Sequence, residues 1–253
     1  MISITANKRI KLWAVAVWLI LWQLASMAIG QEILLVSPVA VLVRLGALIR
    51  TGDFWMSILL SFLKIIGGFL LGITAGTLLA GLSARFRWIG DLLEPFVQTV
   101  KAIPVASFVI LVLIWIPSRN LSIVITFLMV FPIIYTNVCN GLGSMDSQLL
   151  EMAEVFRLSP LIRIRYIYVS QVLPFFRAGC SLALGLCWKA VVAAEVIGIP
   201  DHSIGEKLYE AKIYLNTPDL FAWTLVIIII SVVFEKVFLK VIDGIVGILE
   251  RMG

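Results

Sequence analysis

The sequence predicts an all-α membrane protein with six transmembrane helices in a single domain that covers residues 1–253. The first observation is composition: of 253 residues, 61% are hydrophobic and 14% are charged, and the mean hydropathy is +1.08. Soluble domains are far more polar than this. The second observation is that several apolar segments reach the ~20 residues that a helix needs to cross ~30 Å of hydrocarbon. Because these apolar runs are continuous, they favour helices over a β-barrel.

The first predicted span covers residues 12–29 and follows the basic residues Lys8, Arg9 and Lys11. A cleavable signal peptide is the alternative, because Ser-Met-Ala at 26–28 loosely resembles a cleavage site. The apolar stretch is longer than the ~7–15-residue core of a signal peptide. A retained helix is therefore favoured.

Five further spans are predicted downstream. They cover residues 57–83, 89–116, 121–140, 176–199 and 220–239. Pro104 lies inside the third of them and is expected to kink it, because proline lacks the N–H and clashes with the preceding turn. Residues 31–55 are too polar in places to span and are expected to form a short helix and loop on the outer face.

The distribution of Lys and Arg predicts the orientation, because cytoplasmic loops carry the excess of basic residues. With the N-terminus in the cytoplasm, the larger group lies inside: Lys8, Arg9, Lys11, Arg85, Arg87, Arg157, Arg163, Arg165, Arg177, Lys236, Lys240 and Arg251. The smaller group then lies outside: Arg44, Arg50, Arg119, Lys207 and Lys212. An even number of spans places both termini in the cytoplasm.

A polar segment with several arginines, residues 151–174, interrupts the apolar runs between the fourth and fifth spans. Residues 151–156 suit a short helix. Ser159-Pro160 is a start signal for a second helix, with serine as N-cap and proline at the first helical position. The segment is expected to form a helix–turn–helix on the cytoplasmic surface that docks a soluble partner. An ordinary amphipathic surface loop is the alternative.

Small residues repeat every four positions along the second span, at Gly68, Gly72, Gly76 and Ala80. Such a stripe lets two helix backbones approach closely in lipid. It suits packing within the chain and packing between subunits equally well.

Charged side chains inside spans are expensive in hydrocarbon and face the bundle interior, water or an interface. Lys101 precedes the expected kink at Pro104, and a charge beside a bend in a helix suggests a gate. Lys189 lies near the bilayer middle, and Glu195 lies six residues later on a different helix face. For Lys189, a pathway-facing or ion-paired role competes with a structural polar contact.

Several kinds of chemistry find little support in the sequence. The three cysteines lack metal-type spacing, and His202 is the single histidine, so no metal site is predicted. The net charge of +5 fits the cytoplasmic loops of a membrane protein better than nucleic-acid binding. No phosphate-binding loop is present, so ATP-driven transport would require a separate ATPase chain.

Motifs in order and spacing resemble permease subunits of ATP-binding-cassette importers, over residues 57–251. The polar segment resembles their EAA loop, with Glu151-Met152-Ala153, a bend at 157–159 and the downstream residues 167–174. The customary Leu-Pro of that loop reads Val169-Ser170 here, with Leu173-Pro174 four residues on. Further motifs resemble the branch that includes nitrate, sulfonate, taurine and thiamine-precursor permeases: Leu93-Glu94-Pro95, Lys101-Ala102-Ile103-Pro104, Phe131-Pro132-Ile133 and Trp188-Lys189-Ala190-Val191-Val192-Ala193-Ala194-Glu195.

The resemblance implies the type I importer fold, preceded by an extra helix at residues 12–29. It assigns the coupling helix that enters the ATPase to Glu151, Met152, Ala153, Glu154, Phe156, Arg157, Leu158, Ser159 and Pro160. Candidate residues for the translocation pathway or gate are Lys101, Pro104, Trp188, Lys189 and Glu195, and the candidates for helix packing are Gly68, Gly72 and Gly76.

The implied assembly is a multi-pass complex in the bacterial plasma membrane. Two copies of the permease form the pathway, two ATPase subunits bind ATP and magnesium, and an extracytoplasmic binding protein delivers the solute. The chain itself is then non-catalytic and binds no cofactor. An anion such as a sulfonate suits Lys101 and Lys189, and a pyrimidine thiamine precursor is an equal candidate.

One departure from the family pattern concerns Arg157, which stands where the EAA loop usually has glycine. Arginine enters the left-handed conformation only at some energetic cost, so either the bend differs or Arg157 contacts the ATPase.

Two other functional classes remain as alternatives. A secondary transporter working without an ATPase usually shows repeated halves, and a membrane-embedded enzyme needs clustered catalytic groups; neither is visible.

Overall fold

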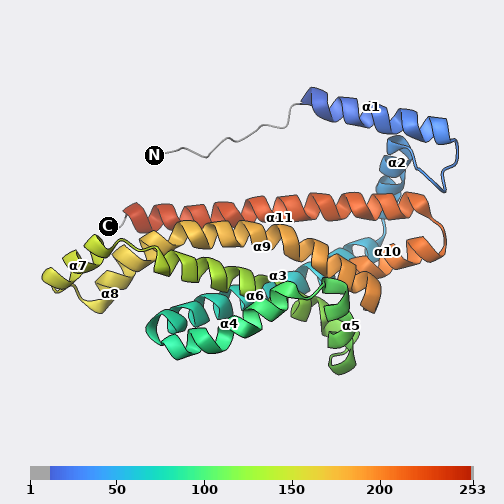
Figure 1. Ribbon diagram of the computed structural model, residues 1–253. Helices are drawn as coiled ribbons and strands as arrows, with labels where there is room; N and C mark the ends of the chain where they lie inside the picture. The colour runs from blue at the N-terminus through green and yellow to red at the C-terminus, as the bar shows by residue number, and fades with distance from the viewer. Residues whose placement is uncertain (1–11, 252–253) are drawn as a thin grey trace.

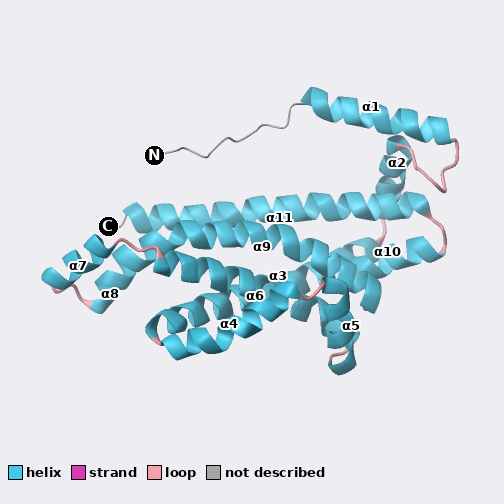
Figure 2. Ribbon diagram, in the orientation of Figure 1, coloured by secondary structure: helices cyan, strands magenta, loops and turns pink. Residues whose placement is uncertain are grey.

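The computed structural model describes residues 12–251, with side chains described from residue 13 to residue 244. Within that range every regular element is a helix, as Figure 2 shows. This confirms the predicted all-α class. The elements are α1 (Leu12–Ile29), α2 (Pro38–Leu48), α3 (Gly52–Arg85), α4 (Arg87–Ala102), α5 (Val105–Trp115), the 3₁₀ turn η1 (Ser118–Asn120), α6 (Leu121–Gly143), α7 (Ser147–Val155), α8 (Pro160–Arg163), the π-helical turn η2 (Ile164–Tyr168), α9 (Val169–Gly198), α10 (Ile204–Ile213) and α11 (Thr217–Arg251).

Three helical stretches in the described range are long and apolar enough to cross a membrane: Gly52–Arg85, Ser118–Gly143 and Pro160–Gly198. The pair α4 and α5 makes a fourth if it is counted as one broken span. Two predicted spans lie outside this count. Residues 12–29 form a shorter apolar helix, and residues 220–239 lie within the continuous helix α11. The chain is therefore a helical membrane protein, and the six-span count stays a prediction.

The third predicted span, residues 89–116, is not one kinked helix. It divides into α4 and α5, whose axes differ by 112°. Ile103 is extended, with φ −77° and ψ 129°, as the residue before a proline usually is. Pro104 is also extended, with φ −59° and ψ 135°, and acts as the N-cap of α5. Two consecutive extended residues turn the chain, where a proline kink alone would have bent it less.

The centre of the molecule is α6, which packs between α3 and α9. The glycine stripe of α3 provides one contact: an added Cβ would lie 2.7 Å from Val130 Cβ at Gly72 and 3.1 Å from Ile134 Cβ at Gly76. At Gly68 it would lie 2.4 Å from the backbone oxygen of Ile123. The stripe is therefore occupied by packing within the chain, where backbones approach closely.

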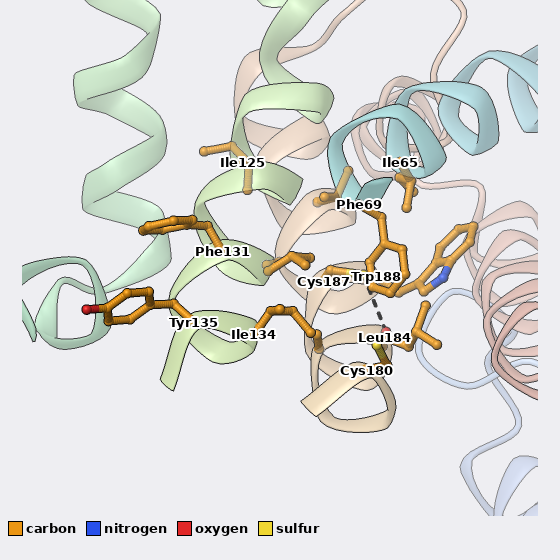
Figure 3. Packing of buried hydrophobic residues seen from close by; sticks show 14 of the residues in the cluster. Ile65, Phe69, Ile125, Phe131, Ile134, Tyr135, Cys180, Leu184, Cys187 and Trp188 are labelled. Carbon is orange, nitrogen blue, oxygen red and sulfur yellow. Dashed lines mark hydrogen bonds between the residues drawn. The ribbon is translucent and has the colours of Figure 1, made fainter. Parts of the chain in front are cut away.

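Aromatic side chains join α11 to this centre. Trp188 of α9 lies 6.2 Å, centroid to centroid, from both Phe62 of α3 and Phe234 of α11. Phe69 of α3 meets Phe238 edge-on at 5.0 Å. Figure 3 shows Phe69 and Trp188 side by side among the aliphatic residues of the core. Such edge-to-face pairs add to the burial of apolar surface.

The N-terminal helices lie to one side of the bundle (Figure 1). Helix α1 exposes much of its apolar surface, including Trp13 and Trp18, so lipid or another chain must cover it. The Trp22 indole N–H donates to the Val36 carbonyl at 2.9 Å and ties α1 to the segment before α2. Helix α2 and its loops are the short helix and loop predicted for residues 31–55, although α3 already begins at Gly52.

Candidate functional site

The segment between α6 and α9 forms two short helices, α7 and α8, at one end of the bundle, near the C-terminus (Figure 1). Asp146 caps α7 by accepting a hydrogen bond from the Gln148 N–H at 2.9 Å. The Asp146 N–H itself donates to the Gln171 side chain of α9 at 3.0 Å. These bonds fix where α7 begins and attach it to the spanning helix that follows.

Helix α7 ends in a left-handed turn. The Leu158 N–H donates to the Ala153 carbonyl, and the Arg157 N–H donates to the Glu154 carbonyl, each at 3.0 Å. This pair of bonds is the Schellman motif, whose left-handed position is usually glycine. Arg157 occupies it with φ 47°. The bend thus keeps the glycine-like conformation although the residue is an arginine.

Helix α8 begins where the sequence predicts. Ser159 is its N-cap and accepts from the Ile162 N–H at 3.5 Å, and Pro160 occupies the first helical turn. Helix α8, the π-helical turn and α9 continue without a break from Pro160 to Gly198. We call residues 147–163 the coupling segment, after the role that the family resemblance predicts for it. Its α8 part continues into α9 as one helical stretch.

The coupling segment exposes large apolar side chains outside the bundle. Val155, Phe156 and Leu161 are 78%, 71% and 80% exposed, whereas Ala153 is 2% exposed and packs inward. Arg163 reaches Glu154 at 3.7 Å and links the two short helices. Apolar side chains gathered on a polar surface segment are typical of a protein interface.

A second polar cluster lies at the other end of α9, around Glu195. The Glu195 side chain is fully buried and accepts hydrogen bonds from Ser122 Oγ at 2.7 Å, Ser61 Oγ at 3.0 Å and the Gly205 N–H at 3.1 Å. Ser61 Oγ in turn accepts from the Ile204 N–H at 3.0 Å. The carboxylate therefore joins α3, α6, α9 and the start of α10.

Ion pairs reinforce the same end of the molecule. Lys207 Nζ lies 2.8 Å from Asp53 Oδ2 and 3.1 Å from Glu210 Oε2. Burial lowers the pKa of Lys207, but its hydrogen bonds to Asp53 and Glu210 raise that pKa above its usual value overall. Arg44 of α2 pairs with Asp219 at the start of α11, with Nη2 2.9 Å from Oδ2. The hydrogen bonds that Arg44 donates to Asp219 raise the pKa of Arg44.

The candidate pathway residues are not brought together in this chain. Lys101 is exposed, donates to Thr136 Oγ1 at 2.7 Å, and borders a cleft of about 540 Å³ with other polar side chains of α4. Lys189 is exposed in a separate open groove of about 640 Å³ along α9. Trp188, 1% exposed, and Glu195 are enclosed by the chain's own helices, and Pro104 lies at the α4–α5 break. Their assignment to a pathway stays a prediction.

The cleft beside Lys101 has a charged wall on α4 that sequence reasoning did not single out. Arg87, Asp91, Glu94, Gln98 and Lys101 line it, spaced three or four residues apart on one face of the helix. That periodicity was available in the sequence. In contrast, Glu195 lies 134 residues from Ser61 and 73 from Ser122, and no local pattern links them.

No group of three or more His, Cys, Asp or Glu side chains among the described residues is arranged to hold a metal ion. The candidate surfaces considered for function among the described residues are the coupling segment at one end of α9 and the grooves beside Lys101 and Lys189. Both belong to a membrane bundle.

Comparison with known proteins finds similar chains among transport proteins. Residues 68–251 match the family described as binding-protein-dependent transport system inner membrane component. The aliphatic sulfonates transport permease protein SsuC of Bacillus subtilis is 27% identical over 239 residues, covering 93% of this chain and 83% of its own. SsuC of Escherichia coli is 27% identical, covering 96% and 90%. The nitrate import permease protein NrtB of Synechococcus elongatus is 26% identical, covering 77% and 73%.

Proposed function

The chain belongs to the family of binding-protein-dependent transport system inner membrane components, and we propose that it engages its ATPase through the coupling segment. The matched family and the relatives make it the permease subunit of an ATP-binding-cassette importer in the sulfonate and nitrate branch. The observation that supports the docking site is the coupling segment itself. It is a capped two-helix element with exposed apolar side chains, attached rigidly to α9.

The mechanism follows from that attachment. Three capping or bend interactions define the shape of the segment: those of Asp146, Arg157 and Ser159. A partner that moves the segment also moves α9, because α8, the π-helical turn and α9 are continuous. Closure of an ATPase dimer bound there would therefore displace a spanning helix as a rigid body and change which side of the membrane the pathway faces.

The proposed assembly contains a second copy of this chain, two ATPase subunits with ATP and magnesium, and an extracytoplasmic binding protein. Membership of a binding-protein-dependent family supports the ATPase and the binding protein. The exposed apolar faces of α1, α4 and α5, with Trp18, Trp88 and Trp115 more than half exposed, support extensive contact with lipid or a second copy.

The proposed topology has six spans with both termini in the cytoplasm of a bacterial cell. Two observations support it. Arg157, Arg163 and Arg165 belong to the turn and short helices between α6 and α9. Arg85 and Arg87 flank the junction of α3 with α4, and the positive-inside rule favours a cytoplasmic location for both connections. Residues 220–239 lie within one continuous helix, α11.

The proposed substrate is a small organic or inorganic anion, with a sulfonate as the first candidate. Relatives from two bacteria are named for aliphatic sulfonates and one for nitrate. Lys101 and Lys189 are exposed in grooves of the bundle, where an ammonium group attracts an anion more strongly than it would in open water.

The decisive experiment is reconstitution of this chain in liposomes with its ATPase and binding protein. Uptake of a labelled alkanesulfonate should require all three proteins and ATP. Nitrate and a neutral pyrimidine serve as competitors that rank the substrate class. Uptake driven by a proton gradient, in liposomes that hold this chain alone, would reject the importer in favour of a secondary transporter.

A further inference from the structure

Glu195 is placed as a structural junction rather than as part of an open surface. A buried carboxylate is strongly unfavourable unless hydrogen bonds replace the water it has lost. Here three donors do so, from Ser122, Ser61 and the Gly205 N–H, and they come from three different elements. Among the side chains of residues 13–244, no basic group forms an ion pair with the carboxylate, so these hydrogen bonds hold it in place.

The fit at the start of α10 is specific to glycine. A Cβ added at Gly205 would lie 2.2 Å from Glu195 Cβ and 2.4 Å from the Glu195 carbonyl carbon. The first turn of α10 therefore lies directly against the last turns of α9. The Ile204 N–H is bonded as well, through Ser61 Oγ. The first two N–H groups of α10, which have no partner inside the helix, thus donate to Ser61 and Glu195. The positive end of the helix dipole also favours a carboxylate at this position.

Glu195 also lies at the far end of the helix that carries the coupling segment. The continuous helical stretch from Pro160 to Gly198 begins with the α8 part of the coupling segment and has Glu195 in its last turn. Figure 1 shows α7 and α8 at one end of the bundle and α10 at the opposite end. A displacement of α10 reaches the coupling segment most directly along this single helix.

We propose that Glu195 is a positioning residue that clamps α10 to α3, α6 and α9, so that contact of the binding protein with the α10 end stimulates the ATPase at the coupling segment. The inference rests on the proposed function, because it takes the ATPase to bind at the coupling segment. The Glu195 side chain is enclosed by the chain's own helices, so its proposed role is exerted through the position of α10.

The proposed contact of Glu195 with α10 depends on hydrogen bonding more than on charge. Two substitutions of Glu195 separate these effects, one that keeps the hydrogen bonds and one that removes them. In Glu195→Gln the amide oxygen still accepts from Ser61 and Gly205, while the amide N–H₂ donates to Ser122, whose hydroxyl also accepts. Glu195→Met has a similar length and no capacity for strong hydrogen bonds. Glu235→Met is the matched control, because Glu235 also accepts from a serine of α9, Ser181, at 3.1 Å but does not touch α10.

The first measurement is hydrogen exchange on the purified full-length permease in nanodiscs, which needs no partner. Amides at the start of α10 should exchange at least about tenfold faster in Glu195→Met than in the wild type, since their acceptors are lost. Glu195→Gln and Glu235→Met should remain within about threefold of the wild type. Unchanged exchange of α10 in Glu195→Met would overturn the clamp.

The second measurement separates positioning from general stability. In the reconstituted complex, basal ATP hydrolysis of Glu195→Met should stay within about twofold of the wild type, while stimulation by the solute-loaded binding protein falls at least about tenfold. Glu195→Gln should restore the stimulation. Equal loss of basal and stimulated hydrolysis, or loss in Glu195→Gln as complete as in Glu195→Met, would contradict the proposal. Absence of stimulation in the wild type would instead count against the proposed function.

Discussion

At the scale of single residues, Arg157 shows how a local conformation is imposed by its surroundings. Its φ of 47° is in the left-handed region, which costs a residue with a Cβ roughly 1–2 kcal/mol. The Schellman bonds of Leu158 and Arg157 to α7, together with the Ser159 cap of α8, hold the turn in this conformation. These hydrogen bonds therefore offset the cost of the left-handed conformation at Arg157.

Replacing Arg157 by glycine is expected to stabilise the permease slightly. The left-handed strain is removed, but glycine also gains freedom in the unfolded chain, so the net increase in unfolding free energy should be about 0.5–1 kcal/mol. Thermal unfolding of the purified protein would measure it. Arg165→Gly, in the π-helical turn, is the control and should lose stability. A decrease for Arg157→Gly would show that the arginine side chain makes stabilising contacts of its own.

Lys189 offers a second test at this scale. Lys189→Met removes the ammonium group from the groove along α9 while keeping a long side chain. Uptake of the delivered anion should fall at least about tenfold, because one favourable charge interaction along this open groove is lost. Thermal stability should not change. Lys240→Met, an equal charge change at an exposed position of α11, is the control, and equal uptake by both variants would remove Lys189 from the pathway.

At the scale of elements, the α3–α6 contact depends on glycines that admit no side chain. Gly72 and Gly67 lie in the same helix, but an added Cβ would lie 2.7 Å from Val130 Cβ at Gly72 and would meet nothing within 4 Å at Gly67. The two positions have the same helix propensity and differ only in what they face.

Gly72→Ala and Gly67→Ala therefore form a matched pair. Gly72→Ala should lower the unfolding free energy by about 1–3 kcal/mol, because the helices must separate to admit the methyl group. Gly67→Ala should raise it by up to about 1 kcal/mol through helix propensity. Thermal unfolding in detergent, followed by tryptophan fluorescence, would compare them. Equal effects would mean that α3 and α6 are not in close contact in the folded protein.

Elements also show what a sequence can and cannot predict. Continuous apolar runs predicted α3, α6 and α9, because burial in lipid requires little more than length and hydrophobicity. Ser159-Pro160 predicted the start of α8, since capping is local. The break at Pro104 was expected as a kink, because whether two extended residues follow one another depends on the surrounding packing.

At the scale of the whole molecule, α9 links two distinct ends. The coupling segment was predictable because its motifs are contiguous in the chain. The Glu195 cluster was not, since its partners lie 134 and 73 residues away and are ordinary serines in apolar helices. The tertiary contacts that determine the role of Glu195 arise only when α3, α6 and α10 have assembled around it.

Substitution of exposed apolar side chains should affect ATPase binding at one end of α9 and not at the other. Phe156 and Leu161 are 71% and 80% exposed on the coupling segment, and Tyr214 and Leu215 are 79% and 67% exposed at the turn after α10. A few residues near the centre of an interface contribute about 2 kcal/mol or more each to binding. Phe156→Ser with Leu161→Ser should therefore weaken association with the ATPase at least about thirtyfold. Tyr214→Ser with Leu215→Ser should leave this association unchanged, because these residues lie at the opposite end of the bundle.

The measurement is the affinity of the purified ATPase for each variant in nanodiscs, with thermal unfolding as the check on folding. Equal weakening by both pairs, or by neither, would place the ATPase elsewhere on the molecule.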